Sequence, residues 1–108
     1  MSEDYTPQQV SELVAQGGVQ VIDVRMTHEH EAGHIPGTRL IELSDLAGQV
    51  DGIDRDAPVI FYCRSGSRSA MATKAFVQAG FDAHNMTGGM LAWEAAALAM
   101  EPVDGSVV

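Results

Sequence analysis

The sequence predicts an α/β fold with a small, mostly parallel sheet of about five strands and helices on both faces of that sheet. Short apolar runs alternate along the chain with alanine- and methionine-rich segments of helical character, which is the pattern of parallel strands joined by helices. The most strand-like run, Pro58–Tyr62, is nearly all apolar, as expected of a central strand covered on both faces. Residues 1–108 are expected to form a single domain, with a core over about residues 5–98 and a loose tail over 101–108.

The first expected elements are a helix, a strand, a polar loop and a second strand. Thr6 is a favourable N-cap for a helix that ends at Gly17. Residues 19–24 include a β-branched run that is typical of a buried strand. The histidine- and glutamate-rich segment 26–37 is expected to be a loop with about one helical turn, and residues 39–43 are expected to form a brief strand.

The remaining elements continue this alternation. A short helix is expected over Ser44–Val50, with the serine as its N-cap. After the central strand, residues 68–79 have the composition of a helix, and Gly80 is its stop signal. A strand over 81–86 and a second alanine-rich helix over 90–100 complete the expected core.

The charge balance excludes two classes of partner. Fifteen acidic and six basic residues give a net charge of −9, whereas a nucleic-acid surface or the face of an anionic membrane requires a basic stripe. No apolar run approaches the roughly 20 residues of a transmembrane helix, and residues 1–5 do not resemble a secretory signal. A single cysteine, Cys63, excludes an intramolecular disulfide, so we expect a cytoplasmic protein with no nucleic-acid or membrane partner.

The most informative feature is the expected strand, loop and helix around Cys63. This residue ends the central strand, at the sheet edge where open α/β proteins bind their ligands. The small residues 65–67 allow the backbone to curl into a ring of N–H donors, and the helix that begins near Arg68 directs its positive end toward the sulfur. With Arg64 and Arg68 nearby, the thiolate is favoured, and comparable sites lower the pKa of a cysteine from about 8.5 to about 3.5–7.5.

Two alternatives bear on this loop. A structural cysteine would have apolar neighbours, but the residues after Cys63 are charged, hydroxylated or glycine. A thiolate in a ring of N–H donors can attack phosphorus or sulfur, and loop length separates the two reactions. The loop is one residue shorter than the loop of cysteine phosphatases, whose arginine stands where Ser69 stands here. The smaller ring better suits a persulfide.

Four segments, in the right order, resemble the single-domain rhodaneses, a family of sulfurtransferases. They are Val21–Arg25, Glu31–Gly37, Cys63–Ser69 and Gly88–Trp93. The resemblance runs from about Val19 to Trp93 and implies a rhodanese-like fold, with Cys63 as the nucleophile that takes a sulfane sulfur and holds it as a persulfide. The implied residues that bind substrate and stabilise the persulfide are Arg64, Ser65, Gly66, Ser67, Arg68 and Ser69.

The function implied by this resemblance is that of a thiosulfate sulfurtransferase. A small anionic sulfur donor, attracted by Arg64 and Arg68, would load Cys63, and cyanide, glutathione or a protein thiol would accept the sulfur. No metal or organic cofactor is implied. The alternatives are a sulfur carrier, a persulfide-binding module that delivers sulfur to a partner protein, and, less favoured by loop length, a cysteine phosphatase or an arsenate reductase.

Asp23 and Arg25 end the first expected strand, on the same sheet edge as Cys63. They are interpreted either as a supporting pair that anchors the cysteine loop or as a helix cap or structural ion pair. On the helix over 90–100, Met90 and Trp93 lie three residues apart and are expected to be core residues.

Residues His30 to His34 fit the His-Glu-x-x-His pattern of zinc proteases. That pattern needs one continuous helix to place both histidines on the same face. Gly33 and the segment 35–37 break any helix here, so we expect no metal site.

Overall fold

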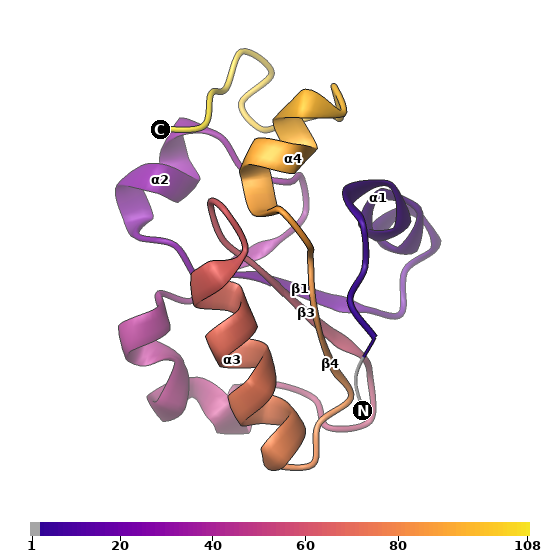
Figure 1. The fold of residues 1–108 in the computed structure, drawn as a ribbon. Coiled ribbons are helices and arrows are strands. Elements are labelled where there is room, and N and C mark those ends of the chain that lie inside the picture. Colours follow the sequence, from indigo (N-terminus) through magenta and orange to yellow (C-terminus); the bar gives the residue numbers. More distant parts are fainter. Residues whose placement is uncertain (1–2) are drawn as a thin grey trace.

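The structure is a computed structural model that describes residues 3–108. Within these residues, four parallel strands form one sheet in the order β2, β1, β3, β4 (Figure 1). The strands are β1 (Gln20–Asp23), β2 (Arg39–Leu40), β3 (Val59–Tyr62) and β4 (Ala83–Asn85). An isolated parallel bridge between Tyr5 and Met86 extends the β4 edge, so the expectation of about five strands is close.

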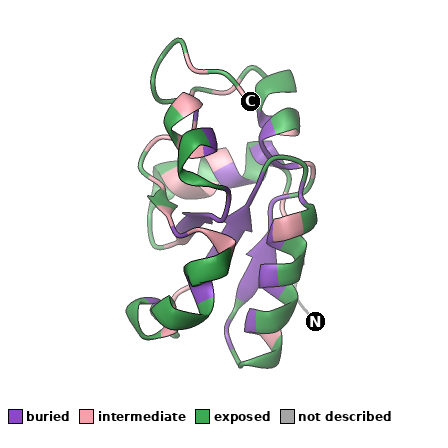
Figure 2. Ribbon diagram, turned by 90° about the vertical axis from the view of Figure 1, so that its left-hand side faces the viewer, coloured by how far each residue is buried: buried purple, intermediate pink, exposed green. Residues whose placement is uncertain are grey.

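Helices cover both faces of the sheet, as predicted. One face is covered by α1 (Pro7–Gln16) and α4 (Gly89–Ala95), and the other by α3 (Ser67–Gln78) and the 3-10 helix η1 (Leu43–Gly52). A short helix, α2 (Thr27–Ala32), follows β1. Figure 2 shows the strands buried between these layers and the outer sides of the helices exposed. Within the described part of the chain, no helix is both long enough and apolar enough to cross a membrane.

The central strand β3 separates two apolar clusters. Val59 and Phe61 pack with the cluster of η1 and α3, whereas Ile60 and Tyr62 pack with the cluster of α1 and α4. Successive side chains of a strand point to opposite faces, and all four are fully buried, so both faces are covered. The all-apolar run therefore has the environment that the sequence predicts for it.

Several element ends differ from the predictions. The expected strand over 39–43 is shorter, because the chain after Leu40 turns into η1, which is a 3-10 helix rather than an α-helix. The helix expected to reach Met100 ends at Ala95. Ala97 has a positive φ of 56°, and the Trp93 indole N–H donates to the Ala99 carbonyl at 3.0 Å, so the chain turns back over the helix.

The segment 101–108, expected to be a loose tail, is hydrogen-bonded to the domain. Glu101 and His34 exchange two backbone hydrogen bonds of 2.9 Å, and the Ser106 N–H donates to the Ala32 carbonyl at 2.9 Å. The backbone at Ser106 can approach Gly33 closely because Gly33 has no side chain. A Cβ at residue 33 would lie 2.7 Å from the Ser106 carbonyl oxygen. The segment that the sequence predicts as a loose tail thus makes hydrogen bonds with residues distant in sequence, which no local pattern indicates.

The start of α4 lies directly against the residues that follow β3. The N–H groups of Met90 and Leu91 donate to the carbonyls of Cys63 and Arg64 at 2.9 and 3.0 Å. Gly89 allows this approach: its φ is +58°, and a Cβ would lie 2.5 Å from the Cys63 oxygen. Any side chain at this position would push the helix away from the chain segment that it supports.

We predict that Gly89→Ala destabilises the protein by about 2 kcal/mol more than Gly18→Ala does. Gly18 also has a positive φ, of +81°, but nothing lies within 4 Å of a Cβ built there. Gly18→Ala therefore measures backbone strain alone, and the difference measures the steric clash. Urea unfolding followed by circular dichroism checks this prediction, and equal losses for the two variants would contradict it.

Candidate active site

Cys63 follows β3 directly, at the carboxyl edge of the sheet. The strand β1 runs parallel to β3 and pairs Asp23 with Tyr62, so β1 ends at the same edge of the sheet. Cys63 is fully buried. The parallel topology therefore brings the two predicted site regions, around residues 23–25 and 63–69, to one end of the sheet.

The loop after Cys63 wraps its donors around the sulfur. The Gly66 N–H donates to Cys63 Sγ at 3.1 Å, the Ser69 N–H at 3.4 Å and the Ser69 hydroxyl at 3.3 Å. Gly66 makes the sharp turn with a φ of 104° and precedes the first residue of α3, Ser67. The loop thus brings hydrogen-bond donors to the sulfur from the residues that the sequence suggested.

These hydrogen bonds act on the pKa of the Cys63 thiol. Burial of Cys63 by itself raises its pKa, because a thiolate is poorly solvated in the interior. The hydroxyl of Ser69 and the backbone N–H groups of Ser69, Gly66 and Ser65 act in the opposite direction and outweigh burial. The pKa of Cys63 is therefore lowered, which favours the nucleophilic thiolate.

Other parts of the fold satisfy the outward-facing groups of the loop. The Asn85 side chain on β4 donates to the Gly66 carbonyl at 3.3 Å. Together with the α4 N–H groups that bind the carbonyls of Cys63 and Arg64, this contact holds the loop from outside. Because its carbonyls bind outward, the loop can direct N–H groups inward at the sulfur.

Arg68 is not free to bind a ligand with its whole guanidinium group. Its Nη1 and Nη2 donate to the two carboxylate oxygens of Glu29 at 2.8 and 2.9 Å. Glu29 is buried on α2, and the pair lowers the pKa of Glu29 to about 2, chiefly through the Arg68 hydrogen bond. The sequence prediction of the site omitted Glu29. The available signal was an acidic residue in the first turn of a short helix, in a segment that the prediction treated mainly as loop.

The other loop side chains lie farther from the sulfur chemistry. Arg64 is exposed, and its Nε donates to the Val108 carbonyl of the tail at 3.1 Å. The hydroxyls of Ser65 and Ser67 lie 3.4 Å from each other on the exposed side of the loop. The contribution of Ser65 to the thiol is thus made by its backbone N–H.

Asp23 and Arg25 form a fully buried ion pair. Arg25 Nη2 donates to Asp23 Oδ2 at 2.8 Å and to the Gly33 carbonyl at 2.8 Å, and His30 Nδ1 lies 2.9 Å from the same Asp23 oxygen. These bonds connect the end of β1 to the last turn of α2 and to Gly33, which follows it. The geometry favours the interpretation as a structural ion pair, which supports the site through the helix that carries Glu29.

The His-Glu-x-x-His segment does not lie on one helix. α2 ends at Ala32, and Gly33 follows it, so His34 is outside the helix. The rings of His30 and His34 are stacked with their centroids 3.8 Å apart, and His34 Nδ1 bonds the His30 carbonyl at 2.8 Å. Within residues 3–108, no three His, Cys, Asp or Glu side chains converge as metal ligands.

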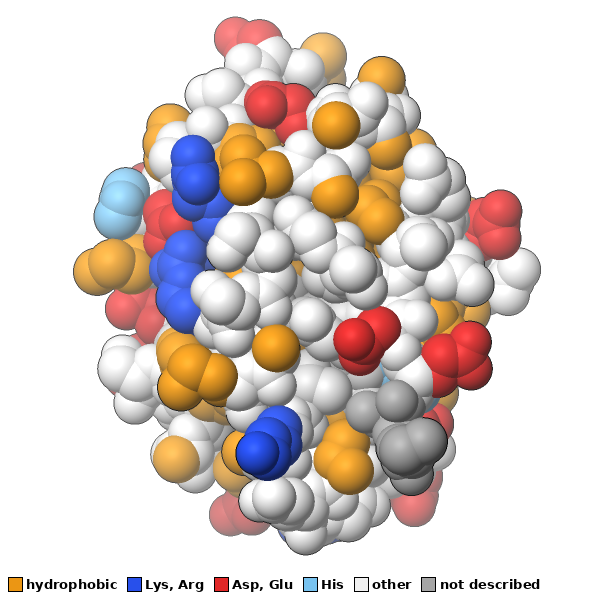
Figure 3. Space-filling model, in the orientation of Figure 1, with side chains coloured by type: hydrophobic (Ala, Val, Ile, Leu, Met, Phe, Trp, Pro, Cys, Tyr) orange, Lys and Arg blue, Asp and Glu red, His pale blue; other side chains and the backbone are white. Residues whose placement is uncertain are grey.

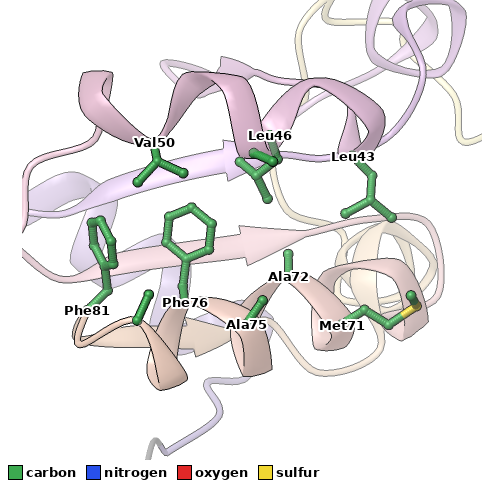
Figure 4. Close-up of a pocket in the computed structure, with 10 residues that line it drawn as sticks. Leu43, Leu46, Val50, Met71, Ala72, Ala75, Phe76 and Phe81 are labelled. Carbon is green, nitrogen blue, oxygen red and sulfur yellow. The ribbon is translucent and has the colours of Figure 1, made fainter.

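The surface also has an apolar pocket whose lining does not include Cys63. An apolar pocket of about 330 Å³ lies between η1 and α3, and its lining includes Leu43, Leu46, Met71 and Phe76 (Figure 4). The side chains of the two helices point toward one another across it. Its lining residues belong to the η1 and α3 face of the sheet and do not include Cys63.

Comparisons with known proteins agree with this architecture. A family model described as "Rhodanese-like domain" matches residues 6–96. The chain is 36% identical over 88 residues to the thiosulfate sulfurtransferase GlpE of Pseudomonas aeruginosa, covering 81% of this chain and 79% of that protein. It is 39% identical over 74 residues to the putative sulfurtransferase YtwF of Bacillus subtilis, covering 68% and 72%.

A solved structure shows the same fold. The rhodanese-related protein of Thermoplasma volcanium superposes with a TM-score of 0.84 at 24% identity, covering 91% of this chain and 96% of that chain. At this identity the likeness concerns the fold alone. The family model, by contrast, spans most of the sequence, and the curled cysteine loop lies inside the matched region. The chain therefore belongs to the family of rhodanese-like domains.

Proposed function

We propose that this protein is a sulfurtransferase that moves a sulfane sulfur from thiosulfate or a similar donor to a thiophilic acceptor through a persulfide on Cys63. The family match and the named relatives support sulfurtransferase activity in general. The observation that carries the proposal is the convergence of the Gly66 and Ser69 donors on Cys63 Sγ. This arrangement stabilises a negative charge on sulfur, as both the thiolate and the persulfide require.

The proposed reaction has two steps. In the first, the Cys63 thiolate attacks the outer sulfur of thiosulfate; a new sulfur–sulfur bond forms, the bond to the sulfonate breaks, and sulfite leaves with the electron pair. In the second, cyanide, glutathione or a protein thiol attacks the outer sulfur of the persulfide, and the Cys63 thiolate is regenerated. A covalent intermediate of this kind predicts ping-pong kinetics.

The loop residues have distinct proposed roles. Cys63 is the nucleophile, and the backbone from Arg64 to Ser69 supplies N–H groups that stabilise the charged sulfur. Ser69 adds its hydroxyl, and Arg64 attracts an anionic donor, with a smaller contribution from Arg68, whose charge is paired with Glu29. These steps use no metal ion and no organic cofactor.

A sulfur-carrier function is the second candidate. Both loop arginines are already bound, Arg64 to the tail and Arg68 to Glu29, and Cys63 is fully buried. A site of this kind can hold a persulfide while reacting slowly with free small anions. A carrier would therefore form the persulfide but transfer its sulfur rapidly only to a partner protein.

The proposed chemistry fits the cytoplasm. The single cysteine must stay reduced to act as a nucleophile, and the cytoplasm keeps thiols reduced. The net charge of −9 favours neither nucleic acid nor an anionic membrane as a partner. The proposed partners are therefore small sulfur donors, cyanide, and small or protein thiols.

Thiosulfate is predicted to add one sulfur atom to the reduced protein, because the stabilised thiolate attacks sulfane sulfur. Intact mass spectrometry detects the adduct, and thiocyanate released by cyanide measures the second step. Cys63→Ser is the control and is expected to gain no sulfur. The absence of an adduct with any sulfane donor, or an equal adduct on Cys63→Ser, would reject the sulfurtransferase. A stable adduct with slow release to cyanide would favour the carrier.

The pH dependence of Cys63 alkylation tests the role of the loop donors. Reactivity rises as the thiol loses its proton, so the lowered pKa of Cys63 places the midpoint at a lower pH than that of an ordinary cysteine thiol. Ser69→Ala removes a donor to the thiolate and raises the pKa of Cys63, so its midpoint moves to higher pH.

Ser67→Ala is the matched control for this measurement. It makes the same change in the same loop, but the hydroxyl that it removes bonds Ser65 and not the sulfur. Rates of reaction with a small neutral alkylating reagent, each normalised to its high-pH plateau, give the two midpoints. Equal midpoints for Ser69→Ala and Ser67→Ala would show that the Ser69 hydroxyl does not stabilise the thiolate.

A further inference from the structure

We propose that Glu29 is a positioning residue that shifts the donor preference of the site, by neutralising Arg68, from dianionic thiosulfate toward sulfane-sulfur donors with a single negative charge. This inference rests on the proposed sulfurtransferase function. It concerns the class of donor that loads Cys63 and not whether Cys63 is loaded.

The first argument is the geometry of the pair. The carboxylate of Glu29 binds both terminal nitrogens of Arg68, which fixes the plane and the direction of the guanidinium group. The carboxylate is held in turn by the Met26 N–H at 3.0 Å. Glu29 is 8% exposed and Arg68 34% exposed, so water screens the carboxylate poorly. Arg68 is thus an oriented partner of Glu29 and not a free cation for a substrate.

The second argument is the closeness of this pair to the sulfur. Arg68 directly precedes Ser69, whose N–H and hydroxyl lie 3.4 and 3.3 Å from Cys63 Sγ. The Glu29 hydrogen bonds raise the pKa of Arg68 most strongly, against the effect of burial, and the charge of Cys63 also raises it. Arg68 therefore lies within electrostatic range of Cys63, and any charge that cancels Arg68 acts on the same region. The residue that sets this charge is on α2 and not in the cysteine loop.

The third argument is the local balance of charge. Asp23 cancels Arg25, and Glu29 cancels Arg68. Among residues 3–108, Arg64 is the loop arginine that pairs with no Asp or Glu side chain; it is exposed and bonds the Val108 oxygen of the tail. On the face shown in Figure 3, the basic side chains over α2 and the start of α3 lie beside acidic ones. In a protein with a net charge of −9, this site offers little attraction for a second negative charge on the donor.

Two probes separate the charge of the donor from its chemistry. Thiosulfate carries two negative charges, and the methanethiosulfonate anion replaces one of its oxygens with a methyl group and carries one. In both reactions the Cys63 thiolate attacks the terminal sulfur and the bond from that sulfur to the sulfonyl sulfur breaks. The electron pair leaves on sulfite in the first case and on methanesulfinate in the second.

The measurement is kcat/KM for persulfide formation from each donor, expressed as the ratio of thiosulfate to methanethiosulfonate. Glu29→Gln keeps the shape of the side chain and leaves the charge of Arg68 uncancelled. The ratio is expected to rise about three- to tenfold, the effect of one charge at this range in a partly hydrated site. The rise in the ratio is expected to come mainly from a lower KM for thiosulfate. It is expected to shrink at high salt, because ions screen the charge.

Two further variants test the cause of this shift. The double variant Glu29→Gln/Arg68→Gln has a neutral pair again, so its ratio is expected to return toward the wild-type value. Glu31→Gln removes the same charge from an exposed position of the same helix and is expected to change the ratio little. A rise as large as in Glu29→Gln, in either of these proteins, would overturn the inference.

The outcomes for the inference and for the proposed function are distinct. If both donors load wild-type Cys63 but Glu29→Gln leaves their ratio unchanged, the sulfurtransferase stands and the role of Glu29 is rejected. If neither donor loads Cys63, the proposed function fails and the inference fails with it. Should Glu29→Gln not fold, Arg68→Gln provides the opposite test: its ratio must fall, because Glu29 is then uncancelled, and an unchanged ratio overturns the inference.

Discussion

The inward direction of the N–H groups around Cys63 Sγ is the constraint on which the site depends. A loop can point its N–H groups at one atom only if its carbonyls find partners elsewhere. Here the first turn of α4 and the side chain of Asn85 bind those carbonyls. The absence of a side chain at Gly89 lets α4 come close enough to do so. The thiolate is therefore stabilised by the packing of the whole α4 and β4 side of the domain against one loop.

An acidic protein stabilises an anionic sulfur in this site through oriented dipoles rather than through an excess of positive charge. The donors from Gly66 and Ser69 act at 3.1–3.4 Å from the sulfur and outweigh the cost of burial. The arginines contribute less free charge than their position in the sequence suggests, because Arg68 is bound by Glu29. Local hydrogen bonds act at short range, so the net charge of the chain does not decide the state of Cys63.

The parts of the fold that could be predicted are those with local signals. The β-branched runs and the N-cap at Thr6 locate β1, β3 and α1 to within a residue or two. The cysteine loop was also predictable, because Cys63 and the donors to its sulfur are close together in the sequence. The differences from the predictions lie where contacts between residues that are not neighbours set the path of the chain. The Trp93 indole N–H bonds the Ala99 carbonyl, so the chain turns back after α4, and the C-terminal segment packs closely against Gly33.

The α/β class and the loop whose donors surround the Cys63 sulfur could both be predicted from the amino-acid sequence, since each follows from residues that are neighbours in the chain. Which charges near the sulfur are cancelled depends on the tertiary structure. Glu29 and Arg68 are 39 residues apart in the sequence, and they meet because parallel strands place α2 beside the start of α3. In the same way, Asp23 and Arg25 form a buried ion pair that bonds the end of α2, a contact that only the three-dimensional fold reveals. Pairing of charges depends on distances in space, and no local pattern encodes them.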